Sequence, residues 1–488
     1  MTEYKQLPVS VLGDFAIVSE KQADQFLCEE REMFSARIVV LDDDPTGTQT
    51  VHDVPVYTDW TRETLAAAFE DGAPLFFILT NSRSFSREET TLVHKEIACA
   101  LSDAARKTGV DFLLISRGDS TLRGHYPLET EILKETLESY SDLRFDGEII
   151  CPYFKEGGRF TIGNVHYVHE GEFLTPAGAT EFAGDKTFGY QSSHLGEYVE
   201  EKSCGKYRKE DCIYISLEDL RAQHYDAVTD QLLQASGFQK IIVNAVDDCD
   251  VKVFSVCWLR AMKSGKRFMA RSAAGLVKAI GNISPKPLLS REELVDSTFP
   301  AGGLIIVGSH VRKTCMQLNA LKASVQPFAF LEFHVADYFT EGNLERETQD
   351  VLARTENLLK TGQTVVIYTS RELLIPDTVN KDAILKFSVN ISEALTSIVH
   401  LLECKPKFII AKGGITSSDV ATKGLGIKKA RVMGQIRKGI PVWMTGAESK
   451  FPDTPYIIFP GNVGEIDTLK EIAEELSRSS ELRQEEIL

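Results

Sequence analysis

Three aspartates stand side by side at positions 42–44, and a Pro-Thr-Gly-Thr turn follows them. The residues before them, 38–41, are all apolar, and this run predicts a strand that is buried on both faces, as in a parallel α/β sheet. Pro45 and Gly47 end that strand, so the carboxylates lie at its carboxyl end, where open α/β sheets place their ligands. A solvated acidic turn is the alternative, but the strand before the aspartates and the turn after them favour a site.

Two further polar loops follow predicted strands in the same half of the chain. The strand 75–79 leads to a loop with Ser82 and Arg83, and the strand 112–115 leads to the loop 116–125. Because parallel strands end at one edge of a sheet, we expect these loops to converge on the aspartates. Arginine offers a planar fork of donors that suits a carboxylate, while Asp and Ser side chains suit sugar hydroxyls. The candidate substrate-binding residues, including one from the later loop 157–161, are Arg83, Asp119, Ser120, Arg123 and Arg159.

The arginines also have a structural interpretation. Arg83 and Arg123 would then only neutralise the aspartates, and Arg159 would only hold its own loop. For three polar loops that converge, however, a ligand site is the better explanation. His166 and His169 lie three residues apart in a strand-like run, so their side chains point to opposite faces of the strand. A metal site built on this pair is therefore disfavoured.

Three turns with glycine follow predicted strands in the second half of the chain. They are Gly308-Ser309, the Gly-Gly-Ile-Thr-Ser-Ser segment 413–418, and Gly461-Asn462. Glycines let backbone N–H groups approach an oxyanion, and a helix N-terminus favours negative charge, so three such turns indicate a nucleotide site. Taken alone, the middle turn is better explained by hydroxyls that cap its helix, and the chain has no P-loop motif. The candidate residues are Ser309, Gly413, Gly414, Ile415, Thr416, Ser417, Gly461 and Asn462.

The elements that must position these residues alternate along the chain. After a helix near 20–34, strands are predicted at 38–41, 75–79, 112–115, 148–151, 212–215 and 240–243, with helices at 87–107, 128–140, 217–235 and 251–263. A second series of strands is predicted at 303–308, 364–368, 407–411, 441–444 and 456–459, with helices at 312–321 and 384–402. This alternation predicts two α/β domains with mostly parallel sheets and a cleft between them. The expected parts are an N-terminal extension (1–36), a first domain (37–283), a linker with three prolines (284–302) and a second domain (303–488).

The composition excludes several classes of function. The 488 residues carry 71 acidic and 54 basic side chains, and the formal net charge of −17 argues against nucleic acid or an anionic membrane surface as a partner. No segment approaches the length of an apolar membrane span, and the N-terminus lacks the pattern of a signal peptide. Nine scattered cysteines without a Cys-x-x-Cys pair suit free thiols in a reducing compartment, so a cytoplasmic protein is expected.

Taken in order, the motifs resemble those of the four-carbon acid sugar kinases, a family formerly classed as a domain of unknown function. The matching motifs are Asp43-Asp44-Pro45-Thr46-Gly47, Ser82-Arg83, Asp119-Ser120-Thr121-Leu122-Arg123-Gly124, Gly158-Arg159-Phe160-Thr161, Gly308-Ser309, Gly413-Gly414-Ile415-Thr416-Ser417 and Gly461-Asn462. The chain departs from the family at Phe459-Pro460, where many relatives have Lys-Ser, and at Ser116-Arg117, where relatives often have a lysine.

The resemblance implies that the first domain binds a short acid sugar such as threonate, erythronate or a 3-oxo-tetronate, and that the second binds ATP with Mg²⁺. The γ-phosphoryl group would pass to a terminal hydroxyl, as a step of carbohydrate catabolism. Arg83, Arg123 and Arg159 would hold the substrate carboxylate, and Asp43 or Asp44 would orient the attacking hydroxyl and accept its proton. Dimers are common among such enzymes, so a homodimer is an expectation of the resemblance alone.

Two other functions remain open at this point. The first is a phosphosugar isomerase or lyase whose glycine turns hold the phosphate of its substrate and which needs no nucleotide. The second is a sugar-acid sensor that binds both ligands without turnover. ATP binding separates the kinase from the isomerase or lyase, and turnover separates it from the sensor.

Overall fold

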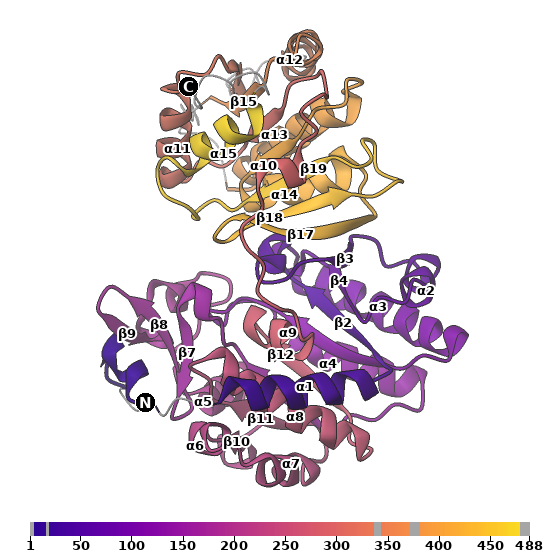
Figure 1. Ribbon diagram of the computed structural model, residues 1–488, viewed down its shortest axis with the longest axis vertical. Helices are drawn as coiled ribbons and strands as arrows, with labels where there is room; N and C mark the ends of the chain where they lie inside the picture. The colour runs from indigo at the N-terminus through magenta and orange to yellow at the C-terminus, as the bar shows by residue number, and fades with distance from the viewer. Residues whose placement is uncertain (1–3, 16–18, 336–342, 371–380, 479–488) are drawn as a thin grey trace. The chain divides into compact units, whose positions relative to one another are not determined.

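The computed structural model describes residues 4–15, 19–335, 343–370 and 381–478 of the chain. It divides into two compact units. The N-terminal unit consists of Met1–Thr50 and Asp59–Pro285, and the C-terminal unit consists of Val51–Thr58 and Lys286–Leu488. Both units combine sheets with covering helices, so the predicted α/β class is confirmed (Figure 1).

A parallel sheet organises the N-terminal unit. Its strands follow the order β10 (Ile213–Ile215), β11 (Gln239–Val243), β6 (Gly147–Cys151), β12 (Phe268–Ser272), β5 (Phe112–Arg117), β2 (Arg37–Asp42) and β4 (Leu75–Leu79), and every neighbouring pair is parallel. Strand β2 is apolar and buried along its length because helices cover both faces of the sheet. The predicted strands of this unit are confirmed closely, whereas β12 was not predicted.

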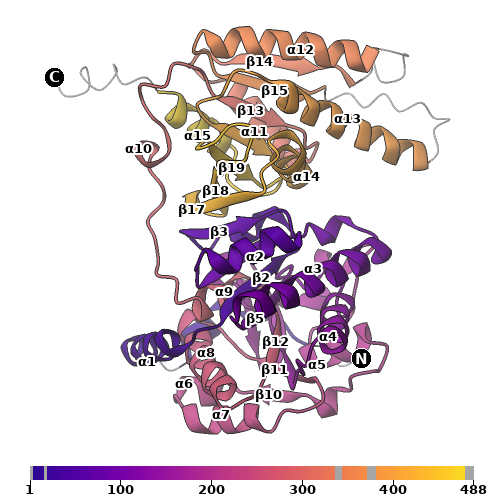
Figure 2. The same cartoon turned by 90° about the vertical axis from the view of Figure 1, so that its right-hand side faces the viewer.

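Helices pack on both faces of this sheet (Figures 1 and 2). One layer contains α2 (Arg62–Glu70), α3 (Arg87–Thr108) and α4 (Leu128–Tyr140), and the other contains α1 (Glu20–Met33), α7 (Tyr225–Leu233), α8 (Asp248–Lys263) and α9 (Ala274–Ile280). The single helix predicted at 217–235 is wrong, since α6 (Leu217–Arg221) and α7 are separate helices. The chain turns between them at Gln223, whose φ of 56° is left-handed and ends a helix.

A small antiparallel sheet also belongs to the N-terminal unit. Its order is β1 (Leu7–Pro8), β9 (Phe173–Pro176), β8 (Val165–Glu170) and β7 (Arg159–Ile162), and α5 (Leu195–Lys202) follows it in the chain. The sheet carries Arg159 at the start of β7. On β8, His166 is buried and His169 is exposed, which confirms that the two rings point to opposite faces.

The C-terminal unit has a mixed sheet. Its strand order is β3 (Val54–Tyr57), β17 (Lys429–Arg437), β18 (Ile440–Thr445), β19 (Pro455–Phe459), β16 (Ile409–Lys412), β13 (Leu304–Val307), β15 (Val365–Thr369) and β14 (Ala329–Phe333). The pairings from β3 to β19 are antiparallel and the rest are parallel. Helices α11 (Arg312–Lys322) and α15 (Thr468–Ser477) pack together, as do α12 (Asn343–Lys360), α13 (Lys381–Leu401) and α14 (Gly414–Asp419).

The division of the chain differs from the expected boundaries in two respects. Residues 51–58 leave the N-terminal unit and place β3 beside β17. The interval 284–302 is also more than a linker, because from Lys286 onward it packs on the C-terminal unit. It contains α10 (Arg291–Leu294), and Leu289, Leu294 and Val295 are buried in that unit's core. The three prolines of this interval predict an extended connection, but the apolar side chains between them pack in the core of the C-terminal unit.

Two smaller expectations concern the whole chain. Within the described ranges, no helix is both long and apolar enough to span a bilayer. All nine cysteines are free, as their scattered positions predict.

Candidate functional site

Four neighbouring strands of the N-terminal unit end in charged side chains at one edge of the sheet. β2 ends at the aspartates 42–44, β4 leads to Arg83, β5 leads to the loop 116–125, and β12 ends at Arg271-Ser272. The parallel register aligns Asp42 with Arg117, and Arg117 in turn with Ser272. The structure therefore confirms that the polar loops converge, and it adds a fourth strand end to them.

Asp42 forms the deepest layer of this cluster. Its Oδ1 lies 3.2 Å from Nη1 of Arg117, and both side chains are almost fully buried. Burial raises the pKa of Asp42 to about 7, although Arg117 acts in the opposite direction. The Oδ2 atom has no hydrogen-bond partner among the described residues. Asp42 is thus a buried, high-pKa carboxyl below the other two aspartates.

Arg83 is shared by the next two aspartates. Its Nη2 and Nε donate to the two carboxylate oxygens of Asp43 at 2.5 and 3.1 Å, and its Nη1 donates to Asp44 at 3.3 Å. Asp44 also accepts from the backbone N–H and the hydroxyl of Thr46, at 2.9 and 2.5 Å. Burial raises the pKa of Asp43 in spite of Arg83. Burial acts in the same direction on Asp44, but Arg83 and Thr46 outweigh it and lower the pKa of Asp44.

Arg271 and Glu129 form a buried ion pair that the sequence analysis missed. Nη1 of Arg271 donates to Glu129 at 3.0 Å and to the Ser116 hydroxyl at 3.2 Å, while Nη2 donates to the carbonyl of Arg123 at 3.2 Å. A side chain at Gly118 would overlap the Arg271 guanidinium, so glycine is required for this close approach. In the sequence, the apolar run 268–270 is followed by Arg-Ser, as the other strands are followed by polar residues. This pattern could have indicated the strand and Arg271.

Asp119, Arg123 and Arg159 lie in the more exposed part of the cluster. Nε of Arg123 donates to Asp119 at 2.7 Å, and its Nη1 lies 3.7 Å from Asp185. The guanidinium carbons of Arg123 and Arg159 lie 5.1 and 5.5 Å from the centroid of the Phe182 ring. Burial acts to raise the pKa of Asp119, but Arg83 and Arg123 outweigh it and hold this pKa well below its usual value.

Arg159 and Ser120 differ in how they are held. Arg159 donates to its own loop at the carbonyl of Gly157, it has no carboxylate within ion-pair distance among the described residues, and its buried Nε lacks a partner there. Burial lowers the pKa of Arg159. Ser120 is fixed through its backbone, because its carbonyl lies 2.8 Å from Nε2 of the buried His166. Arg159 therefore keeps more donor capacity for an anion than Arg83 does.

The three glycine turns of the C-terminal unit meet at the carboxyl ends of adjacent parallel strands. They follow β13, β16 and β19. A Cβ atom at Gly308 would overlap the hydroxyl of Thr416, and one at Gly413 would lie 3.0 Å from Cβ of Ser309. A Cβ atom at Gly461 would lie 3.5 Å from the Ser309 hydroxyl. The predicted convergence of these turns is thus present, and we refer to residues 308–309, 413–417 and 461–462 as the glycine cradle.

Within the cradle, the middle turn differs from the expected helix cap. α14 begins at Gly414, and Gly413 adopts a φ of 123°, which favours glycine. Among the described residues no side chain caps this helix, and the Ser417 hydroxyl donates to the carbonyl of Ala411 at 2.7 Å. Ile415 is 68% exposed and Asn462 is also exposed. The backbone N–H groups at the start of α14 are therefore left for a ligand or solvent.

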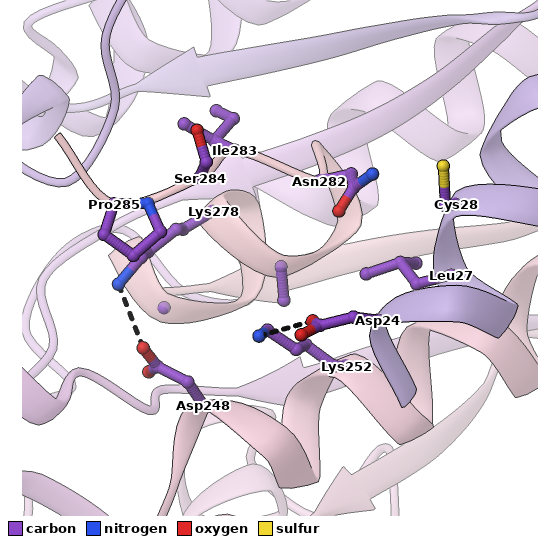
Figure 3. A pocket seen from close by; sticks show the side chains of 12 residues that line it. Asp24, Leu27, Cys28, Asp248, Lys252, Lys278, Asn282, Ile283, Ser284 and Pro285 are labelled. Carbon is purple, nitrogen blue, oxygen red and sulfur yellow. Dashed lines mark hydrogen bonds and ion pairs between the residues drawn. The ribbon is translucent and has the colours of Figure 1, made fainter. Parts of the chain in front are cut away.

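A separate cavity of about 350 Å³ lies in the N-terminal unit between α1, α8 and α9 (Figure 3). All four charged side chains that line it are paired, Asp24 with Lys252 at 2.6 Å and Asp248 with Lys278 at 2.9 Å. The charges that line this cavity therefore neutralise one another. Within the described ranges, no group of three or more His, Cys, Asp or Glu side chains is arranged to hold a metal ion.

Comparisons with known proteins agree with this division of the sites. Residues 38–280 match the family model of a sugar-binding N-terminal domain, and residues 304–469 match that of a nucleotide-binding C-terminal domain. No curated protein matches the chain significantly.

Solved structures share the fold. A Salmonella typhimurium LT2 protein, provisionally described as a tRNA synthase, has 15% identity and a TM-score of 0.63, with 90% of this chain and 98% of that chain covered. Haemophilus influenzae protein HI1011, assigned to DUF1537, has 18% identity and a TM-score of 0.58, with 90% and 100% covered. At these identities the likeness concerns the fold alone, and the family rests on the two domain models. The chain belongs to the four-carbon acid sugar kinase family, with a sugar-binding N-terminal domain and a nucleotide-binding C-terminal domain.

Proposed function

We propose that the protein is an ATP-dependent kinase that phosphorylates a terminal hydroxyl of a short sugar acid, of four carbons or similar. The observation that carries this proposal is the pair of sites, each in the matching domain. The N-terminal unit gathers arginines and aspartates at its strand ends, and the C-terminal unit gathers three glycine turns. Arginines suit the carboxylate of a sugar acid, and backbone N–H groups suit the phosphates of a nucleotide.

Arg123 and Arg159 are the proposed carboxylate-binding residues. All three guanidinium nitrogens of Arg83 donate to Asp43 or Asp44, so we assign Arg83 the role of holding these aspartates in place. Asp43 is the proposed group that orients the acceptor hydroxyl and takes its proton. Its raised pKa supports this choice over Asp44, because a base works best when its pKa approaches the working pH.

The glycine cradle is the proposed binding site for ATP. Backbone donors without side-chain caps fit a polyphosphate, and Ser309 and Thr416 place hydroxyls beside them. Magnesium bound with ATP would neutralise charge on the transferred phosphoryl group. The acceptor hydroxyl must also come within reach of that group, so the reaction requires the two units to bring their ligands together.

An assay of ADP release tests the proposal directly. The full-length protein with Mg·ATP is offered four- and five-carbon sugar acids and their 3-oxo forms, one at a time. Turnover with one of them is expected, and it identifies the substrate as well as the reaction. ATP binding without turnover across the panel would favour the sensor. Conversion of a phosphorylated sugar acid without any nucleotide would favour the isomerase or lyase.

Replacing Gly414 with alanine tests where the phosphates lie. A Cβ atom there meets no other atom within 4 Å, so the fold should be kept and stabilised by up to about 1 kcal/mol, as for glycine-to-alanine changes at compatible positions. The same methyl group would occupy the space in front of the backbone donors, so we expect ATP binding to weaken about tenfold.

Thermal unfolding and calorimetric titration with Mg·ATP measure the two effects of Gly414→Ala separately. Gly184→Ala, at an equally open position in the N-terminal unit, is the control and should bind ATP normally. Unchanged affinity in Gly414→Ala would place the phosphates elsewhere.

A further inference from the structure

Lys412 is the last residue of β16 and directly precedes the middle turn of the glycine cradle. Its side chain is fully buried, and its ammonium donates to the carbonyls of Pro460 and Gly461 at 2.5 and 3.1 Å. The same ammonium lies 4.0 Å from the centroid of the Phe459 ring. Within the described ranges, no carboxylate lies within ion-pair distance of it. Lys412 thus presents a buried cation without a counter-ion.

Such an arrangement is unfavourable for the charged form of the side chain. Two carbonyls and a ring face replace only part of the lost hydration, and a buried ammonium normally acquires an anionic partner or loses its proton. Burial lowers the pKa of Lys412 to about 7, and the like charge of Lys313 on α11 acts in the same direction. Asp419, at the end of α14, is engaged by Lys423 and Ser392.

The ammonium of Lys412 contacts the glycine cradle through the carbonyl of Gly461. Gly461, whose carbonyl accepts from Lys412, also accepts from the Thr314 hydroxyl at 3.2 Å, and Thr314 lies 3.3 Å from the Ser309 hydroxyl. Lys412 therefore joins the turn after β19 to the turn after β16, and Gly461 carries no side chain that would shield the charge.

We propose that Lys412 is the cation of the nucleotide site, and that the phosphates of the bound nucleotide are the counter-ion that its buried ammonium lacks. This inference rests on the proposed function, in which the cradle binds ATP, and it assigns the cradle a charged residue from β16. The glycine turns supply neutral donors, and Lys412 supplies the positive charge that they lack.

The proposal implies that ATP binding is coupled to proton uptake. Burial lowers the pKa of Lys412 to about 7 in the free protein, and a bound polyphosphate would raise this pKa and favour the protonated form. The affinity for ATP is then highest below the free pKa of about 7 and falls as the pH rises above it. At pH 7.5, above this pKa, ATP binding should therefore be accompanied by a net uptake of protons.

Calorimetric titration of the full-length protein with Mg·ATP at pH 7.5 tests this coupling. Runs in two buffers of different ionisation enthalpy give the number of protons taken up. Lys412→Met removes the charge and keeps an apolar chain beside Phe459, and we expect it to bind ATP about 10- to 100-fold more weakly with no proton uptake. Lys423→Met changes an exposed lysine close in the chain and should behave as the wild type.

The outcomes separate this inference from the function on which it rests. ATP binding by Lys412→Met with the affinity of the wild type would overturn the role of Lys412, whatever the proton uptake. This result would leave the kinase proposal standing. Absence of ATP binding by the wild type would instead reject the kinase proposal itself. Thermal unfolding of Lys412→Met confirms that the variant is folded before its affinity is compared.

Discussion

Replacing Asp43 with asparagine is expected to lower the rate of phosphoryl transfer by a factor of about 10² to 10⁴, the usual contribution of a positioned general base. The amide keeps the shape of the carboxylate but cannot accept the proton of the acceptor hydroxyl. Arg83 retains Asp44 as an ionic partner, so the loop should stay in place. ATP affinity should remain unchanged, because the cradle belongs to the C-terminal unit. Steady-state kinetics and calorimetric titration with Mg·ATP measure the two quantities.

The control for Asp43→Asn is Asp103→Asn, which alters a carboxylate on the surface of α3 that pairs with Arg62 and Arg106. This variant should keep both the rate and the ATP affinity of the wild type. Full activity in Asp43→Asn would remove Asp43 from the mechanism, and Asp44→Asn would then be the next variant to test. A loss of ATP affinity in Asp43→Asn would contradict the assignment of the two ligands to separate units.

Replacing Arg271 with methionine is expected to destabilise the fold by about 3–5 kcal/mol, because it leaves a buried carboxylate without its partner. Glu129 is 2% exposed and loses its ion pair, and Asp43 loses a second nearby cation. Chemical denaturation at pH 8 measures the change in the free energy of unfolding. The matched control is Lys107→Met, which breaks an exposed pair with Glu70 and should cost at most about 1 kcal/mol.

The destabilisation by Arg271→Met should also depend on pH. Burial acts to raise the pKa of Glu129 in the wild type, but Arg271 and neighbouring groups outweigh it and lower that pKa. Its ionised form therefore stabilises the wild type above the unfolded pKa, and this contribution is lost as the pH falls. In the variant the pKa of Glu129 rises, and protonation relieves the buried charge. We expect a smaller difference between variant and wild type at pH 5 than at pH 8, and an equal difference at both would show that lost packing is the cause.

Local patterns in the sequence determined the larger part of the two sites. An apolar run that ends in Asp-Asp-Asp, Ser-Arg or Gly-Gly-Ile-Thr indicates both a buried strand and the loop at its carboxyl end. Since parallel strands end at one edge, the convergence of these loops followed from the fold class alone. The α/β class, most strands and the three turns of the cradle were predictable for this reason.

Only the tertiary structure decided which charges meet within each site. Arg271 reaches Glu129, and β3 joins a strand from the other half of the chain, across separations that no local pattern encodes. Arg83 carried the same sequence signal as Arg159, yet it is bound to two aspartates, while Arg159 keeps a donor without a partner among the described residues. The sequence places Lys412 at the end of a predicted strand but does not indicate its partners, because the carbonyls that accept from it come from a different strand end. These pairings depend on strand order and burial. Strand order decides which side chains become neighbours, and burial strengthens their electrostatic interaction because the interior has a low dielectric constant.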